Sequence, residues 1–234
     1  MEQPTFPMRI NRYLAWKKYA TRREADELIR AGKVSVNGKP AVIGETVRES
    51  DIVEVREWPR EYRYYAFNKP RGVITHSPQG EEKAIADITK LKGVFPIGRL
   101  DKDSYGLIIL TDDGRLTDTL LNPEHGHEKE YEVTTLAELP HYFKGKMEHG
   151  VDIGGYVTKP CKIEMLGKKK FTIALTEGKK HQIRRMCGAL GQSAEELKRI
   201  RIMNIELGAL RPGEHRTIKG AELDAFLSAL GFTA

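Results

Sequence analysis

The chain is poor in cysteine, has no long apolar run and lacks the common cofactor motifs. Cys161 and Cys187 are the only cysteines among 234 residues. They form neither a Cys-x-x-Cys pair nor the Cys/His spacing of a zinc site, so we expect packed thiols and no metal. No stretch is apolar enough to cross a membrane, and no charged and then apolar leader opens the sequence, which favours a cytoplasmic protein. Glycine-rich phosphate-binding motifs are also missing, so nothing points to nucleotide hydrolysis or a dinucleotide cofactor.

The charge balance is mildly basic. The sequence has 39 Lys and Arg residues against 33 Asp and Glu residues, a formal net charge of +6. This excess favours polyanionic partners without identifying one. The basic runs at 168–170 and 198–201 are typical of solvated strand faces, and they are also candidates for the path of an RNA strand.

Residues 8–56 are predicted to form a small α/β unit. Helical character over 9–18 precedes a second helix that opens at Thr21, where Thr21 and Glu24 fit a capping box, and Gly32 is placed to end it. Asn37-Gly38 between the short apolar runs 34–36 and 40–43 predicts a hairpin. Residues 51–55 alternate as a strand.

Basic side chains crowd the start of this unit. Six of them lie between positions 9 and 23, namely Arg9, Arg12, Lys17, Lys18, Arg22 and Arg23. Such a face suits RNA phosphates, which supply affinity without base specificity. An ordinary helical hairpin with a solvated basic face is the alternative.

Residues 56–61 contain a proline and no periodicity, which predicts a linker. A second domain, 62–234, should follow it. Strands are expected at 64–67, 72–75, 95–97, 107–111, 131–135, 171–175 and 200–207, and helices at 115–122, 181–190 and 221–230. The sequence therefore predicts an α+β fold, with a small N-terminal α/β domain before a domain built on a mainly antiparallel mixed sheet.

A compact polar loop lies between two of these strands. It runs from Gly98 to Leu107 and holds Arg99, Asp101, Asp103 and Ser104. Loops that rigid strands hold in place often carry catalytic groups, whereas a solvated turn is the ordinary alternative.

The block Gly98-Arg99-Leu100-Asp101 resembles the central motif of the RsuA/RluB/RluE/RluF family of RNA pseudouridine synthases. Glu128 to Val133 resemble the second motif of the same family, and Gly178 to Met186 resemble the third. Within the family, the sequences of these motifs are most similar to the RluF branch, whose members act on uridines of large-subunit ribosomal RNA. Residues 8–56 likewise resemble the S-four (S4) RNA-binding domain.

The resemblance implies roles for five residues. It makes Asp101 the catalytic carboxylate, and leaves open whether this group attacks the sugar, attacks the base or helps to remove a sugar proton. Tyr131 would stack against the target base, although a half-buried core tyrosine is the commoner case. Arg184 would pair with the aspartate, with a phosphate contact as the alternative. Arg99 would brace the space left by the flipped base, and Leu207 would be a wall of the uracil pocket.

The sequence thus predicts a pseudouridine synthase that isomerises a uridine of ribosomal RNA, with 23S RNA as the favoured target. Arg9, Arg12, Arg22 and Arg23 would contact that RNA. We expect no cofactor, because the reaction is an isomerisation, and we expect a monomer with no membrane or protein partner. A synthase acting on 16S RNA or transfer RNA, and a non-catalytic RNA-binding ribosome-assembly factor, are the alternatives.

Overall fold

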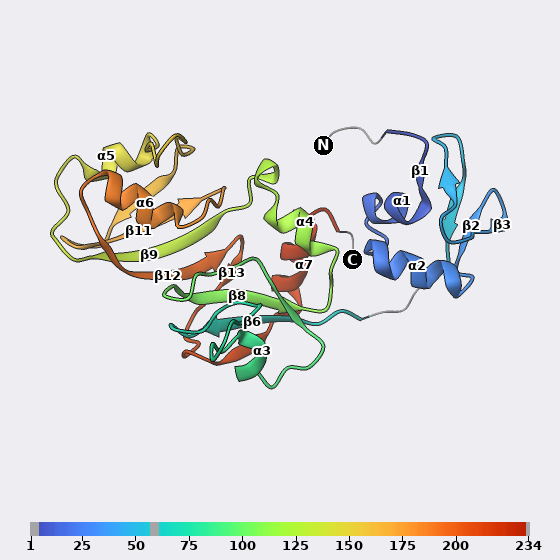
Figure 1. Ribbon diagram of the computed structural model, residues 1–234, viewed down its shortest axis with the longest axis horizontal. Coiled ribbons are helices and arrows are strands. Elements are labelled where there is room, and N and C mark those ends of the chain that lie inside the picture. The colour runs from blue at the N-terminus through green and yellow to red at the C-terminus, as the bar shows by residue number, and fades with distance from the viewer. Residues whose placement is uncertain (1–4, 57–60, 233–234) are drawn as a thin grey trace. The chain divides into compact units, whose positions relative to one another are not determined.

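The computed structural model describes residues 5–56 and 61–232, and these fall into two compact units (Figure 1). The N-terminal unit contains the residues up to Tyr62 together with Asp113–Arg115, and the rest of the chain forms the larger unit. Most of the predicted linker at 56–61 lies outside the described residues.

The N-terminal unit packs two helices against short strands (Figure 1). Its core contains Ile10, Leu14 and Leu28, all of them buried. The predicted capping box is confirmed, because the Thr21 hydroxyl accepts from the Glu24 amide and the Glu24 carboxylate accepts from the Thr21 amide. The elements are β1 (Met8–Arg9), α1 (Ile10–Trp16), α2 (Arg22–Arg30), β2 (Val34–Val36), β3 (Lys39–Pro40), β4 (Thr46–Val47) and β5 (Val53–Val55).

The hairpin predicted at Asn37-Gly38 is confirmed, because β2 pairs antiparallel with β3, but its second strand is shorter than the apolar run 40–43. Strand β3 ends at Pro40, and the side chains of Val42 and Ile43 are 63 % and 49 % exposed. The Glu45 carboxylate accepts a hydrogen bond from the Val42 amide at 2.8 Å and closes a turn there. A side chain that bonds the backbone locally competes with strand pairing, and here it prevails.

Among its described residues, the larger unit has a nine-stranded sheet in the order β10-β11-β9-β12-β8-β6-β14, with β13 paired to β12 and β7 paired to β8. Every pairing is antiparallel except that of β8 with β12. The predicted α+β class and mainly antiparallel mixed sheet are therefore confirmed. The strands are β6 (Tyr64–Lys69), β7 (Phe95–Ile97), β8 (Tyr105–Thr111), β9 (Lys129–Thr135), β10 (Lys162–Met165), β11 (Lys170–Leu175), β12 (Ala194–Ile202), β13 (Ile205–Glu206) and β14 (His215–Thr217).

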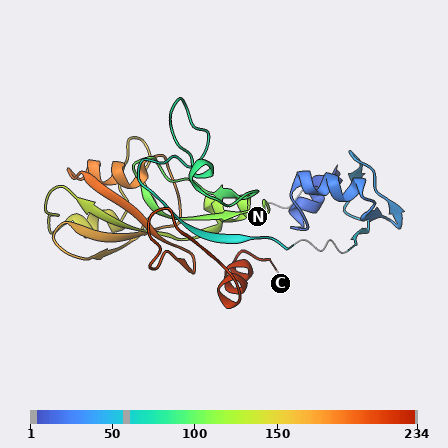
Figure 2. The ribbon, with the colours of Figure 1, turned by 90° about the horizontal axis from the view of Figure 1, so that it is seen from below.

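Helices cover both faces of this sheet, with α6 on one side of the strands and α7 on the other (Figure 2). Residues 107–111 of β8 are accordingly buried on both faces. The helices predicted at 115–122, 181–190 and 221–230 are each correct to within one residue at either end. The helical segments are α3 (Ile85–Ile88), α4 (Leu116–Leu121), η1 (Pro123–His125), α5 (Phe143–Glu148), α6 (Gln182–Ala189) and α7 (Ala221–Ala229).

Two strand predictions in this unit need correction. Residues 72–75 form a turn with a single bridge from Ile74 to Ala84, because Gly72 takes a positive φ and Thr75 turns inward. The strand expected at 200–207 is a hairpin of β12 and β13, which reverses where Met203 adopts φ +52°.

Both thiols are packed, as predicted. Burial raises the pKa of Cys187 to about 12 and that of Cys161 to about 11. In the described stretches 5–56 and 61–232, no helix combines the length and apolarity needed to span a membrane.

Candidate active site

The loop with Asp101 runs between β7 and β8, as the sequence predicts. Two hydrogen bonds with a buried threonine hold its backbone in place. The Thr75 hydroxyl donates to the carbonyl oxygen of Leu100 at 2.9 Å and accepts from the Leu100 amide at 3.0 Å. Leu100 itself is 7 % exposed, whereas the Asp101 side chain that follows is 44 % exposed. The loop therefore has a fixed backbone and presents its carboxylate outward.

A lysine without any exposed surface braces the same loop. The Lys69 ammonium, at the end of β6, donates to the carbonyl oxygens of Pro70, Val73 and Lys102. Burial lowers the pKa of Lys69 to about 8, and the charges of Asp101 and Asp103 oppose that shift in part. Because it joins 70–73 to residue 102, this side chain ties the segment after β6 to the Asp101 loop.

Asp101 lies beside a cavity of about 590 Å³, which is within the usual range for ligand pockets, roughly 300–1,000 Å³. Both polar and apolar side chains line it. The lining includes Arg99, Asp101, Ser104, Leu121, Lys129, Tyr131, Leu175, Glu177, Lys179, Lys180, His181, Gln182, Ile183, Leu197 and Arg199. Such a mixture suits a flat heterocycle, whose faces are apolar and whose edge carries carbonyl and amide groups.

Tyr131 stands on β9 with its ring toward this cavity. It packs against the same core as Val133, while Glu130 and Glu132 form ion pairs with Arg201 and Lys170. The predicted alternation of this strand is confirmed. The Tyr131 hydroxyl lies 3.5 Å from Nη1 of Arg199, and the Arg199 guanidinium carbon lies 5.9 Å from the ring centroid.

A buried carboxylate shapes the rim that faces Asp101. Glu177, which is 4 % exposed, accepts from the Tyr156 hydroxyl at 2.5 Å, the Lys159 amide at 3.0 Å and Nε2 of Gln182 at 2.8 Å. The bond from Tyr156 is the main reason why the pKa of that tyrosine is raised. The network fixes the turn that leads into α6, where Nε2 of His181 lies 3.7 Å from Oδ1 of Asp101.

The predicted pairing of Arg184 with Asp101 is not found. Ile183 lines the cavity, but the next residue along α6 points elsewhere, and Nη1 of Arg184 donates to the carbonyl oxygen of Ala194 at 2.6 Å. In the part of the chain that the structure describes, the basic side chain in ion-pair range of Asp101 is His181, an imidazole that forms an ion pair only when it is protonated. The structure thus brings together Arg99, Asp101 and Tyr131 but leaves Arg184 outside the pocket.

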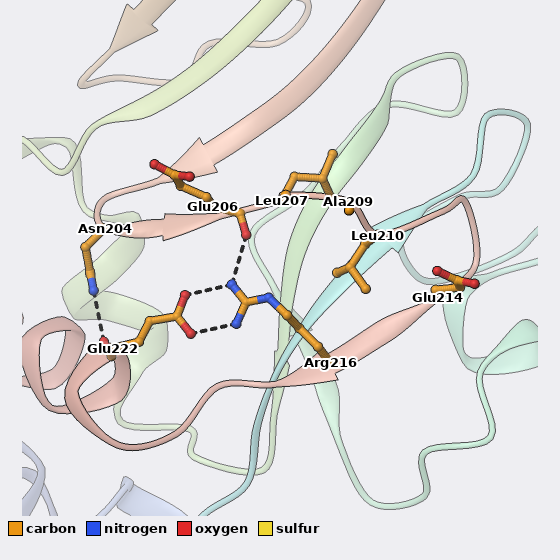
Figure 3. Close-up of a pocket in the computed structure, with 9 residues that line it drawn as sticks. Asn204, Glu206, Leu207, Ala209, Leu210, Glu214, Arg216 and Glu222 are labelled. Atoms are coloured by element: carbon orange, nitrogen blue, oxygen red, sulfur yellow. Dashed lines mark hydrogen bonds and ion pairs between the residues drawn. The ribbon is translucent and has the colours of Figure 1, made fainter.

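Leu207 does not reach this pocket either. It lines a separate cavity of about 640 Å³ between β13 and β14, where Arg216 makes paired hydrogen bonds to Glu222 and also donates to the carbonyl oxygen of Glu206 (Figure 3). The reason is the hairpin after β12, which carries Leu207 away from the site. On the Asp101 side, β12 supplies Leu197 instead.

In the N-terminal unit, the four arginines expected to contact RNA are Arg9, Arg12, Arg22 and Arg23, and all of them are exposed. No group of three metal-ligating side chains occurs within 5–56 or 61–232.

Four polar side chains of the site were not predicted from the sequence, namely Lys69, Lys129, Glu177 and Arg199. Lys129 lines the cavity, and burial together with the charge of Arg199 lowers its pKa to about 8. Arg199 belongs to the basic run at 198–201, yet it is 2 % exposed. The available signal was strand alternation, since 199 follows the buried Leu197 by two residues and shares its face.

The comparison with known proteins agrees with this geometry. The family model described as RNA pseudouridylate synthase matches residues 63–189, and the S4 domain model matches residues 8–53. A solved structure described as a pseudouridylate synthase superposes with a TM-score of 0.68 at 27 % identity, over 95 % of this chain and 99 % of that one. The larger unit therefore has the fold of an RNA pseudouridylate synthase.

Similar proteins of known name identify the family of pseudouridine synthases to which the chain belongs. The dual-specificity RNA pseudouridine synthase RluF of Escherichia coli is 42 % identical over 94 % of this chain and 78 % of its own length. The ribosomal large subunit pseudouridine synthase B of Bacillus subtilis is 34 % identical over 92 % of this chain and 93 % of its own length. This chain belongs to the RsuA/RluF family of RNA pseudouridine synthases.

Proposed function

We propose that this protein converts a uridine of large-subunit ribosomal RNA to pseudouridine in the cytoplasm. The observation that carries the proposal is the placement of Asp101 and Tyr131 at one cavity, on a rigid loop and a strand of a pseudouridylate synthase fold. Names of two relatives support the substrate, since one is a large-subunit synthase and the other is an RluF enzyme of dual specificity.

The reaction breaks the bond from the sugar carbon C1′ to N1 of uracil and forms a bond from C1′ to C5. The proton on C5 is lost and N1 gains one, so the overall change is an isomerisation without an added reactant. A base inside a duplex is out of reach of Asp101, and the nucleotide must therefore be flipped into the cavity. We assign the bond exchange to Asp101, stacking on the base to Tyr131 and bracing of the space left behind to Arg99.

The remaining candidates receive different roles. Arg184 is proposed to position the start of β12 through its bond to Ala194. A direct role for Leu207 would require the hairpin after β12 to rearrange. The domain proposal is an RNA-binding head at 8–56, with Arg9, Arg12, Arg22 and Arg23 on RNA phosphates, and a catalytic domain at 62–234.

The test compares Asp101→Asn with Asp103→Asn, a change of the same kind two residues along the same exposed loop. Each variant would be supplied to a strain that lacks the gene, and pseudouridine would be mapped across the ribosomal RNA. We expect the wild type and Asp103→Asn to restore one large-subunit position and Asp101→Asn to restore none, with equal protein levels. Restoration by Asp101→Asn would exclude this carboxylate, and no missing position in the deletion strain would favour a non-catalytic RNA-binding factor.

A further inference from the structure

Arg199 is a buried cation at the pocket of Asp101 and Tyr131. It stands on β12 directly opposite Tyr131 in the strand register and is 2 % exposed. Its Nε donates to the carbonyl oxygen of Leu107 at 2.7 Å, and its Nη1 lies 3.3 Å from the carbonyl oxygen of Arg99. These contacts fix the plane of the guanidinium against the Asp101 loop.

One nitrogen of this guanidinium has no partner. Within the described residues, Nη2 of Arg199 is fully buried and makes no hydrogen bond, although the residue lines the cavity. A buried donor on a charged group that lacks an acceptor is costly, typically by ~1–3 kcal/mol or more. An oxygen atom of a ligand in the cavity would satisfy it after a small shift of the side chains around the guanidinium, because Nη2 has less than 1 Å² of accessible surface.

The chemistry of the proposed reaction supplies such an oxygen. If the electron pair of the C1′–N1 bond stays with uracil as that bond breaks, negative charge spreads over N1 and the carbonyl oxygens of the ring. Fixed donors aimed at developing charge are the largest source of catalysis in many enzymes. Arginine suits this task because it stays charged and its fork of donors is rigid.

We propose that Arg199 is a catalytic residue that donates from Nη2 to a carbonyl oxygen of the flipped uracil and stabilises the charge on the freed base. The same side chain holds the Tyr131 hydroxyl through Nη1, which keeps the aromatic ring beside the base. When C5 of the freed base bonds to C1′, the electron pair of the base forms the new bond and the negative charge is consumed. The proton on C5 is then lost and N1 gains one, which leaves the total charge unchanged. This inference rests on the proposed function, because it names a further group for the same reaction.

Lys129 does not replace Arg199 in this role. Its ammonium donates to the carbonyl oxygen of His127 at 3.3 Å, and its pKa of about 8 means that it loses charge in mild alkali. Lys69 on β6 also lies near Arg199, and the other titratable side chains that line the cavity are Asp101, Tyr131, Glu177, Lys179, Lys180 and His181. Of the two arginines that line the cavity, Arg199 is buried and Arg99 is exposed.

The experiment measures single-turnover pseudouridine formation at saturating RNA for Arg199→Met and Arg199→Lys. The matched control is Arg216→Met, which also removes a hydrogen-bonded arginine from a strand of this sheet, at the other cavity. We expect Arg199→Met to lose about 100-fold or more in rate with little change in RNA affinity. Arg216→Met should lower thermal stability while the rate stays within about threefold of the wild type.

Arg199→Lys provides the second readout. A buried lysine loses its proton more readily than arginine, so the rate of this variant relative to wild type should fall as the pH rises from 7 to 9. A constant ratio would overturn the proposal, as would an Arg199→Met variant within about threefold of the wild-type rate. If Arg199→Met does not fold, the pH dependence of the lysine variant decides. A wild-type protein that forms no pseudouridine on any ribosomal RNA would instead refute the proposed function.

Discussion

Gly106 is the position in the sheet where a single methyl group should do most damage. It lies in β8 at the parallel pairing with β12, directly opposite Arg199, with φ +105°. A Cβ atom there would be 2.3 Å from the carbonyl oxygen of Arg199 and 2.8 Å from its amide nitrogen. Both atoms belong to the backbone, so the strands would have to move apart to accept alanine.

Two penalties add in Gly106→Ala. A positive φ costs a residue with a side chain ~1–3 kcal/mol, and an overpacked contact costs another ~1–3 kcal/mol. We expect the variant to lose about 2–6 kcal/mol of unfolding free energy. That is a large share of the stability of an ordinary domain, typically ~5–15 kcal/mol. Since the displaced strand carries Arg199, activity should fall as well.

The assay is urea unfolding followed by far-UV circular dichroism. Both tryptophans, Trp16 and Trp58, precede residue 63 in the sequence, so intrinsic fluorescence reports the N-terminal part of the chain separately. Gly191→Ala is the matched control, because Gly191 has φ +72° but no atom within 4 Å of an added Cβ. It should lose only the conformational penalty, about 1–2 kcal/mol. A Gly106→Ala variant as stable as Gly191→Ala would refute the steric reasoning.

Two further predictions concern charge. Replacing Arg22 and Arg23 with alanine should weaken RNA binding. The slope of log K against log salt should fall by about one unit for each phosphate that these arginines neutralise. An unchanged slope in a filter-binding titration would show that these residues do not contact the RNA. The second concerns Lys69, whose pKa falls from 10.5 to about 8 on folding. Between these values the unfolded chain binds more protons than the folded one, so stability should rise with pH relative to Lys69→Met, as urea midpoints at pH 8 and pH 10 would reveal. A constant difference between the two proteins would contradict the burial of a charged lysine.

The sequence was sufficient for those parts of the protein whose signal is local. The capping box at Thr21 and the three helices predicted in the larger unit depend on neighbours within a few residues, and the structure confirms each. The loop with Asp101 was also recognisable, since two apolar strands bracket it. Two strand predictions needed correction because local interactions compete with strand pairing. The hairpin strand expected to reach 43 ends at Pro40, where a carboxylate bonds the backbone, and a positive-φ glycine with an inward threonine interrupts the strand expected at 72–75.

The supporting groups of the site were harder to find because they look like surface residues. Lys69, Glu177 and Arg199 are charged, and charged side chains are almost never fully buried unless they are paired. Some of their partners lie far away in sequence: Arg199 bonds Leu107, and Lys69 bonds Lys102 as well as the nearby Pro70 and Val73. The order of the strands in the sheet brings such segments together, and that order cannot be read from a single sequence. Motif resemblance therefore found Arg99, Asp101 and Tyr131 at the cavity, but it also named Arg184 and Leu207, which lie outside it, and it missed the supporting groups.

The β8–β12 pairing explains how one cation serves several parts of the site. Gly106 has no side chain, so the backbone of β12 approaches β8 closely enough for Nε of Arg199 to bond the next carbonyl, that of Leu107. From this anchor the guanidinium extends beneath the Asp101 loop to the carbonyl of Arg99 and to the Tyr131 hydroxyl. A longer distance between β8 and β12 would move the guanidinium away from the Arg99 carbonyl and from the Tyr131 hydroxyl. The glycine with positive φ and the buried arginine therefore act together, and a substitution at either position should disturb the aspartate loop and the aromatic ring together.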